Sequence, residues 1–131
     1  MRFIVASMLL AVGIIHLLPL SGVLSAARLF DLYGITFEDP NLEILMRHRA
    51  VLFGLLGIFL LTSAFLPNLQ LAALITGFVS VVSFLYLAYS VGGYNDQVNR
   101  IVTADKAALV CLLVGSITYA INYSTTNDLK A

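Results

Sequence analysis

The segment from Asp39 to Leu66 constrains the fold of this chain more than any other. It opens with Asp39 and Pro40, a strong helix start, because aspartate accepts hydrogen bonds from the first turn and proline loses none there. No helix breaker follows until Pro67, so about 26 residues can form one helix, roughly 39 Å long. The hydrocarbon core of a bilayer is about 30 Å thick. The apolar part of this helix is therefore predicted to span a membrane, with its charged start projecting from the hydrocarbon.

The composition indicates that lipid is the solvent of the whole chain. Of its 131 residues, 60% are apolar and 11% are charged, whereas about a quarter of the residues in a soluble domain are charged. A soluble core of this size cannot hide so much apolar surface. The formal net charge is zero and no basic patch occurs, so nucleic acid is not a predicted partner. A lone cysteine, Cys111, excludes an intrachain disulfide.

Four apolar runs predict four transmembrane helices, at about residues 3–21, 46–66, 69–91 and 104–123. Between the first two, an amphipathic segment ending at Gly34 predicts a short helix at the membrane interface, or alternatively a lid over the end of the bundle. We therefore expect an all-α polytopic membrane protein, an antiparallel four-helix bundle that forms a single domain over residues 1–131. One alternative is that Leu24-Ser25-Ala26 marks the end of a cleaved signal peptide.

Small residues recur along one face of several predicted spans. Gly54 and Gly57 share such a face in the second span, and in lipid these faces mark close contact with another helix. Gly13 and His16 share the corresponding face of the first span, so His16 is expected to point into the bundle. The tight uncharged turn at 67–70 predicts that the second and third spans form a hairpin.

Nearly all membrane-proximal ionisable groups fall at one end of the predicted bundle, the end formed by loops one and three, which we call the polar end. The candidate ligand-binding residues are those that gather there: His16, Glu43, Arg47, His48, Arg49, Tyr94, Arg100, Asp105 and Lys106. Glu43 and Arg47 have the i, i+4 spacing of an ion pair, either exposed at the interface or facing a polar pocket. An ionisable group within a span, such as His16, is a functional candidate, although a hydrogen bond to a neighbouring helix is its commoner role.

No spacing in the sequence indicates a metal site, a nucleotide site or a cofactor. The patterns His-x-x-x-His, Glu-x-x-His and Cys-x-x-Cys do not occur, and neither does a glycine-rich phosphate loop. A bis-histidine haem would need His16 and His48 at matching depths, which their positions do not favour. The predicted partners are the lipid bilayer, an amphiphilic small molecule, and a second copy of the chain packed through the Gly/Ala faces.

The distribution of positive charge predicts an orientation. Loops one and three hold most of the positively charged residues: Arg28, Arg47, Arg49, Arg100 and Lys106. The opposite side has Arg2, Lys130 and an uncharged turn. Because lysine and arginine collect on the cytoplasmic side, loops one and three are expected to be cytoplasmic.

Two local stretches and the four short spans resemble a group of small bacterial inner-membrane proteins over about residues 3–122. The stretches are Leu32-Tyr33-Gly34 and Arg47-His48-Arg49-Ala-Val-Leu-Phe-Gly-Leu-Leu-Gly. In plan, the chain is similar to the DoxX-like four-helix proteins, some of which are tied to quinone-linked oxidation. The resemblance implies a multi-pass protein of the bacterial inner membrane and supplies no residue role. Sequences of this kind are sometimes labelled phosphopantetheine adenylyltransferase, but the His-x-Gly-His motif of that soluble α/β family does not occur here.

Three functions fit these features. The favoured one is a binding or accessory protein whose polar end takes a lipid-like or quinone-like amphiphile. The second is a small membrane enzyme that uses His16 or Glu43 as acid or base, with Arg47 or Arg49 holding an anion. The third is a structural partner that packs through its Gly/Ala faces.

Overall fold

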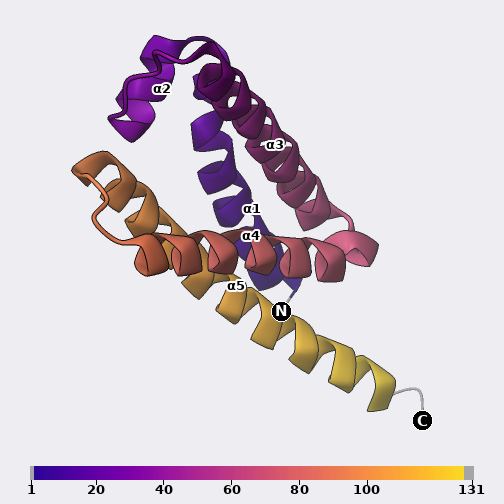
Figure 1. Ribbon diagram of the computed structural model, residues 1–131. Coiled ribbons are helices and arrows are strands. Elements are labelled where there is room, and N and C mark those ends of the chain that lie inside the picture. The colour runs from indigo at the N-terminus through magenta and orange to yellow at the C-terminus, as the bar shows by residue number, and fades with distance from the viewer. Residues whose placement is uncertain (1, 129–131) are drawn as a thin grey trace.

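The computed structural model describes residues 2–128, and in these residues the protein is all-α (Figure 1). The elements in chain order are α1 (Arg2–Leu17), the 3-10 helix η1 (Leu18–Val23), α2 (Ala26–Tyr33), α3 (Pro40–Phe65), the 3-10 helix η2 (Pro67–Leu69), α4 (Gln70–Val91) and α5 (Asp96–Asp128). Four segments of the described chain are long and apolar enough to cross a membrane: Phe3–Val23, Pro40–Phe65, Pro67–Val91 and Asp96–Thr125. The predicted all-α, four-span membrane fold is confirmed.

Capping residues define three helix ends at the polar end of the bundle, two of which, at Asp39 and Gly34, the sequence predicts. Asp39 is the N-cap of α3, and its Oδ1 accepts a hydrogen bond from the Asn41 backbone N–H at 2.8 Å. The Asn95 side chain plays the same part for α5, since its Oδ1 accepts from the Val98 N–H at 2.9 Å. Gly34 ends α2 with φ 66°, a left-handed conformation that glycine adopts without a steric penalty. These caps fix where the polar loops give way to the spans.

The first span differs from the single α-helix that its apolar run suggests. The α-helix stops at Leu17, and the chain continues to Val23 as a 3-10 helix. Pro19 explains the change, because its ring has no N–H and clashes with the carbonyl four residues earlier in an α-helix. The tighter segment packs against α3, where a Cβ added to Gly54 would lie 2.5 Å from Cδ1 of Leu20.

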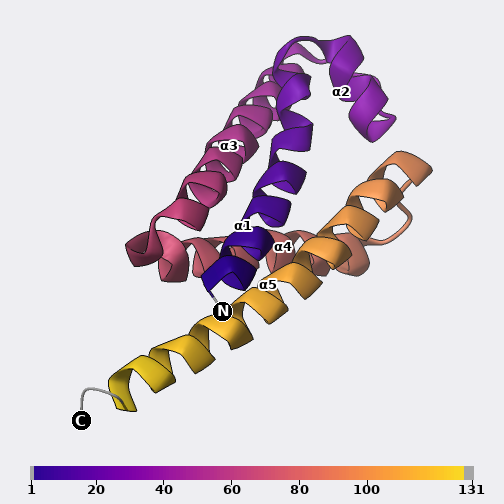
Figure 2. The same cartoon turned by 180° about the vertical axis from the view of Figure 1, so that it is seen from behind.

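The first helix forms the centre of the bundle (Figures 1 and 2). α1 packs along both α3 and α5, and α4 packs mainly on α5. α3 and α4 are predicted to form a hairpin, and η2 joins them. They diverge from this turn, so α3 packs mainly on α1 and α4 mainly on α5. The core contains fully buried side chains from all four spans, among them Leu9, Val12, Leu60, Val81 and Leu112.

Two glycines set the distance between α1 and α3. A Cβ added to Gly57 would lie 2.8 Å from Cγ of Leu17 and 3.0 Å from the backbone oxygen of Gly13. A Cβ added to Gly13 would in turn lie 3.1 Å from the backbone oxygen of Gly57. The predicted small-residue faces are therefore the faces at which the two backbones approach each other.

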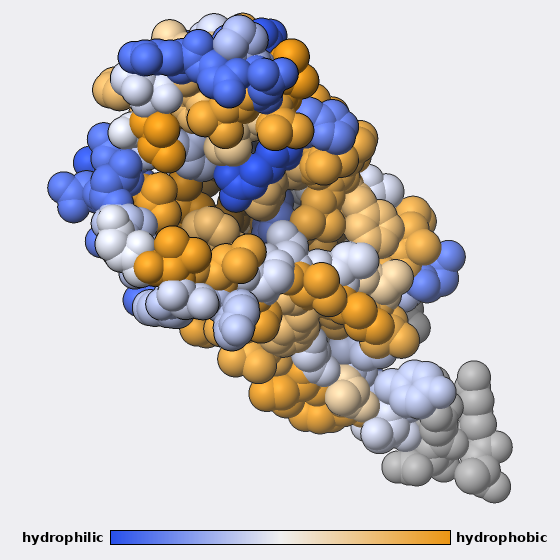
Figure 3. Space-filling model, in the orientation of Figure 1, coloured by the Kyte–Doolittle hydropathy of each residue, from blue (hydrophilic) through white to orange (hydrophobic). Residues whose placement is uncertain are grey.

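The outer surface of the spans is apolar, as lipid requires. Large side chains such as Phe65, Val79 and Ile117 are exposed around the bundle. In the space-filling view, hydrophobic residues cover most of the lower part of the visible face, and hydrophilic residues gather towards the upper part (Figure 3). Polar groups are thus concentrated at one end of the molecule.

We expect Gly57→Ala to destabilise the protein and Gly115→Ala to leave it unchanged or slightly more stable. Both substitutions add one methyl group and favour the helix, but the Gly57 methyl meets a backbone oxygen at 3.0 Å. The Gly115 methyl meets only side chains, Leu74 at 3.3 Å and Met8 at 3.4 Å. The expected loss at Gly57 is about 1 to 3 kcal/mol of unfolding free energy, measured by equilibrium unfolding in mixed micelles. Equal stability of the two variants would contradict the close approach.

Candidate ligand-binding cavity

A cavity of about 250 Å³ opens at the polar end of the bundle. Figure 3 shows a hollow on this face, with hydrophilic and hydrophobic residues around it. The polar residues that line the cavity are His16, Asp31, Tyr33, Arg49, Gln97, Arg100 and Asp105. The apolar residues are Ile15, Leu18, Pro19, Leu32, Phe53, Phe84, Ile101 and Ala104. The lining therefore comes from η1 and all five α-helices, and it is amphiphilic.

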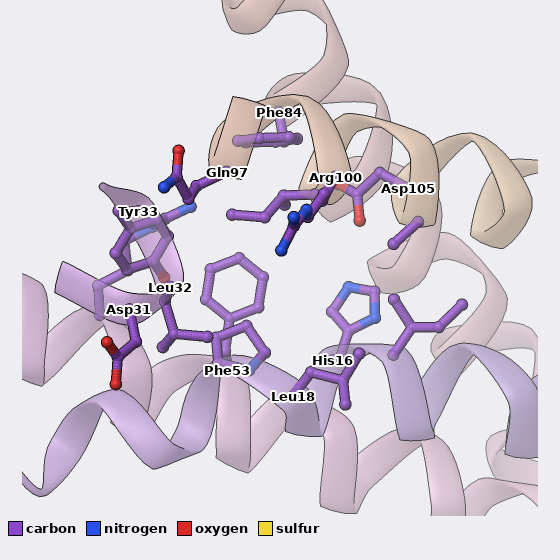
Figure 4. Close-up of a pocket in the computed structure, with 15 residues that line it drawn as sticks. His16, Leu18, Asp31, Leu32, Tyr33, Phe53, Phe84, Gln97, Arg100 and Asp105 are labelled. Atoms are coloured by element: carbon purple, nitrogen blue, oxygen red, sulfur yellow. The ribbon is translucent and has the colours of Figure 1, made fainter. Parts of the chain in front are cut away.

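His16 lies in the last turn of α1, facing the cavity, and is 2% exposed (Figure 4). Its Nδ1 is 2.9 Å from the backbone oxygen of Val12, and its Nε2 is 3.2 Å from Oγ of Ser80 on α4. A carbonyl oxygen can only accept, so Nδ1 donates its proton there, and Nε2 of the neutral ring accepts from the Ser80 hydroxyl. The ring also stacks on Phe53, with centroids 5.8 Å apart. His16 points into the bundle, as predicted.

Arg49 is held by aromatic rings. Its guanidinium carbon lies 4.9 Å from the ring centroid of Phe53 and 5.4 Å from that of Tyr33, both within the range of cation–π attraction. In the described part of the chain, no carboxylate lies within 4.0 Å of its nitrogens and no acceptor receives a hydrogen bond from it. Arg100 likewise has no ion pair or hydrogen bond within residues 2–128. Two guanidinium groups thus line the cavity with free donors.

Asp105 is the most buried acidic group of the cavity, with 8% of its surface exposed. Among the described residues, its carboxylate accepts no hydrogen bond and forms no ion pair. The charge of Arg49 acts on it from beyond ion-pair distance. Figure 4 shows Asp105 and Arg100 on one side of the cavity, with His16 and Phe53 on the other. The cavity therefore contains separated charges of both signs.

Helix α2 forms one wall of the cavity and is fastened at both ends. At its C-terminal end, Nδ2 of Asn95 donates to the Tyr33 carbonyl oxygen at 2.8 Å, which ties α2 to the start of α5. Before its N-terminal end, Nε of Arg47 on α3 donates to the carbonyl oxygen of Val23 at 2.8 Å. Burial raises the pKa of Tyr33, and the charge of Arg49 offsets part of this rise, so its hydroxyl is a neutral donor at pH 7.

The structure brings together four of the residues predicted at the site. His16, Arg49, Arg100 and Asp105 line the cavity. The other five lie outside its lining: Glu43, Arg47, His48, Tyr94 and Lys106. His16 and Glu43, suggested above as alternative acid or base groups, are therefore not neighbours in one cavity.

The residues outside the lining have other partners or face outward. Nη1 of Arg47 lies 3.3 Å from Oε1 of Glu43, with the two side chains 43% and 30% exposed. The pair is partly exposed and lies outside the cavity lining, and such pairs contribute at most about 1 kcal/mol to stability. Nζ of Lys106 lies 5.7 Å from the ring centroid of Tyr89, and His48 is exposed.

Several lining residues were not among the candidates, although their spacing offered a signal. Phe53 follows Arg49 by four residues and so lies one turn along the same face of α3. Gln97 precedes Arg100 by three residues on α5 and shares its face in the same way. Asp31 offers no such signal, because only the packing of α2 brings it to the cavity.

No protein-family model, curated protein or solved structure matches this chain. Within residues 2–128, no three His, Cys, Asp or Glu side chains form a group that could hold a metal ion. The cavity combines cationic donors, a buried carboxylate and a largely apolar wall.

We expect Ser80→Ala to lower the unfolding free energy, because it removes the hydrogen bond to His16. Ser83→Ala should have little effect. The Ser80 hydroxyl bonds to another helix, whereas the Ser83 hydroxyl donates to the Ser80 carbonyl within α4 at 3.0 Å. The expected loss for Ser80→Ala is roughly 0.5 to 1 kcal/mol of unfolding free energy, as for other hydrogen bonds between membrane helices. The ¹⁵N chemical shift of Nε2 in His16 should change only in the Ser80 variant. Identical spectra for both variants would contradict the hydrogen bond.

Proposed function

We propose that this protein binds an amphiphilic small molecule in the cavity at its polar end. The polar part of the ligand lies among Arg49, Arg100 and Asp105, and the apolar part lies against the aromatic and aliphatic wall. The observation that carries the proposal is the pair of guanidinium groups, both without a hydrogen bond or ion pair in the described chain, beside that apolar wall. Arg49 is partly buried, and a guanidinium group in such a site normally finds an acceptor because unused donors are costly there. Arg100 is exposed, so its donors are open to a ligand or to water.

The size of the cavity indicates which part of a ligand it holds. A volume of about 250 Å³ falls below the roughly 300 to 1,000 Å³ of pockets that enclose a drug-sized molecule. A lipid headgroup or a quinone ring fits this volume, whereas an attached hydrocarbon tail does not. The tail would lie outside, against the apolar faces of the spans, where lipid already surrounds the protein.

The cellular setting is part of the same proposal. We propose a protein of the bacterial inner membrane with loops one and three in the cytoplasm, because these loops hold most of the positive charge. The cavity would then face the cytoplasmic leaflet. The similarity in plan to the DoxX-like proteins supports this setting and remains part of the proposal.

The other two functions have less support. An enzyme that uses Glu43 as acid or base has less support because Glu43 bonds to Arg47 outside the cavity. His16 does share the cavity with Arg49, but both of its ring nitrogens are already within hydrogen-bond distance of Val12 and Ser80. A purely structural partner, or a homo-oligomer packed through the small faces, would need those faces free. Gly13, Gly54 and Gly57 instead have close neighbours within the chain.

The test compares two substitutions of one size on the same helix. Ala104→Phe fills the cavity, whereas Ala107→Phe lies on an exposed position of α5 outside the lining. Each purified protein is offered mixed membrane lipids and a quinone, and the bound molecules are measured by native mass spectrometry. We expect the unaltered protein and Ala107→Phe to retain an amphiphile that Ala104→Phe retains at least tenfold less often. Thermal unfolding confirms that both variants are folded. Equal retention by the two variants, or no retention by any protein, would reject the proposal.

A further inference from the structure

Charges of opposite sign face the cavity without pairing with each other. Arg49 and Asp105 are both in its lining, and Asp105 is more than nine-tenths buried. Their charges act on one another, yet no Arg49 nitrogen lies within 4.0 Å of an Asp105 oxygen. Inside a protein of low dielectric constant, such groups usually close into an ion pair, because leaving either uncompensated is costly. Their separation therefore requires an explanation.

Aromatic contacts keep the two charges apart. The guanidinium of Arg49 is attracted to the rings of Phe53 and Tyr33, at 4.9 and 5.4 Å from their centroids. Tyr33 is in turn fixed through its carbonyl oxygen, which accepts from Asn95 at 2.8 Å. Arg49 is thus held on the side of α2 and α3, while Asp105 stays on α5. This arrangement is preorganised for a molecule that has a negative and a positive group of its own.

The charges of the lining also favour a ligand with both a negative and a positive group. It contains two guanidinium groups, Arg49 and Arg100, and two carboxylates, Asp31 and Asp105. A cavity selective for anions alone would gain nothing from a buried carboxylate, which repels the anion. A neutral quinone would leave the separated charges uncompensated.

We infer that the cavity recognises a zwitterionic headgroup, with a phosphate monoanion at Arg49 and a primary ammonium group at Asp105. An ethanolamine phospholipid has this chemistry and carries the tails for which the cavity has no room. The inference rests on the proposed function and narrows its ligand class. A primary ammonium can donate hydrogen bonds to the Asp105 carboxylate, and phosphate accepts the paired donors of arginine.

The experiment measures lipid preference by native mass spectrometry. The full-length protein in detergent is titrated with an equal mixture of phosphatidylethanolamine and phosphatidylglycerol that have identical acyl chains. We expect at least tenfold more of the ethanolamine lipid on the unaltered protein. Asp105→Asn should remove this preference, while Asp96→Asn, an exposed position of α5 outside the lining, should keep it. Arg49→Gln should lower the binding of both lipids.

The outcomes separate the inference from the proposed function. Equal binding of the two lipids, or a preference for phosphatidylglycerol or a quinone, would overturn the zwitterion inference while leaving an amphiphile site. Binding of no amphiphile would overturn both. The preference of the unaltered protein is a test by itself if Asp105→Asn does not fold. Competition by free phosphoethanolamine, but not by glycerol phosphate, would support the headgroup chemistry and identify a soluble source.

Discussion

The interior of a bilayer offers no hydrogen-bond partner to a polar group, and the polar side chains of this protein are placed accordingly. Hydroxyl groups within the spans bond back to their own helix, as Thr62 does to the Ile58 carbonyl and Thr118 to the Val114 carbonyl, both at 2.8 Å. His16 is satisfied by α1 and by Ser80 of α4. Charged groups cannot be satisfied in this way, because a hydrogen bond to the backbone does not offset the cost of placing a charge in hydrocarbon. Most of them therefore lie at the polar end, where the helices leave the hydrocarbon.

The close contact of α1 with α3 brings several of these polar groups together at one cavity. Gly13 and Gly57 let the two backbones approach, and α1 occupies the centre of the bundle against both α3 and α5. The last turn of α1 consequently ends between the polar starts of the other two helices. There His16 is in the same cavity as Arg49 from α3 and Asp105 from α5. The small residues of the spans thus determine which polar groups meet, although they contact none of the ligand-facing donors themselves.

The sequence predicted the features that depend on local chemistry. Asp39 begins a helix and Gly34 ends one as predicted, and the small faces of α1 and α3, with Gly13, Gly54 and Gly57, are buried. It could not separate Arg47 from Arg49, which are both charged and adjacent to the same span. Two residues along an α-helix are about 200° of rotation apart, so only one of them faces α1 and the cavity. Which one does so is decided by the packing of η1 and α2, and that packing depends on contacts between distant segments.

Arg47 shows how a residue outside the cavity supports it. Its Nε holds the Val23 carbonyl oxygen, and this bond fixes the chain just before α2 begins. From the other end, Asn95 holds the Tyr33 carbonyl oxygen. α2 is thereby kept against α3 and α5, with the Tyr33 ring over the Arg49 guanidinium. The position of the Arg49 guanidinium thus depends on α2, which forms no ion pair with it. An ion pair would also have fixed Arg49, but it would have consumed the donors that a ligand needs, whereas an aromatic ring leaves the edge of the guanidinium open.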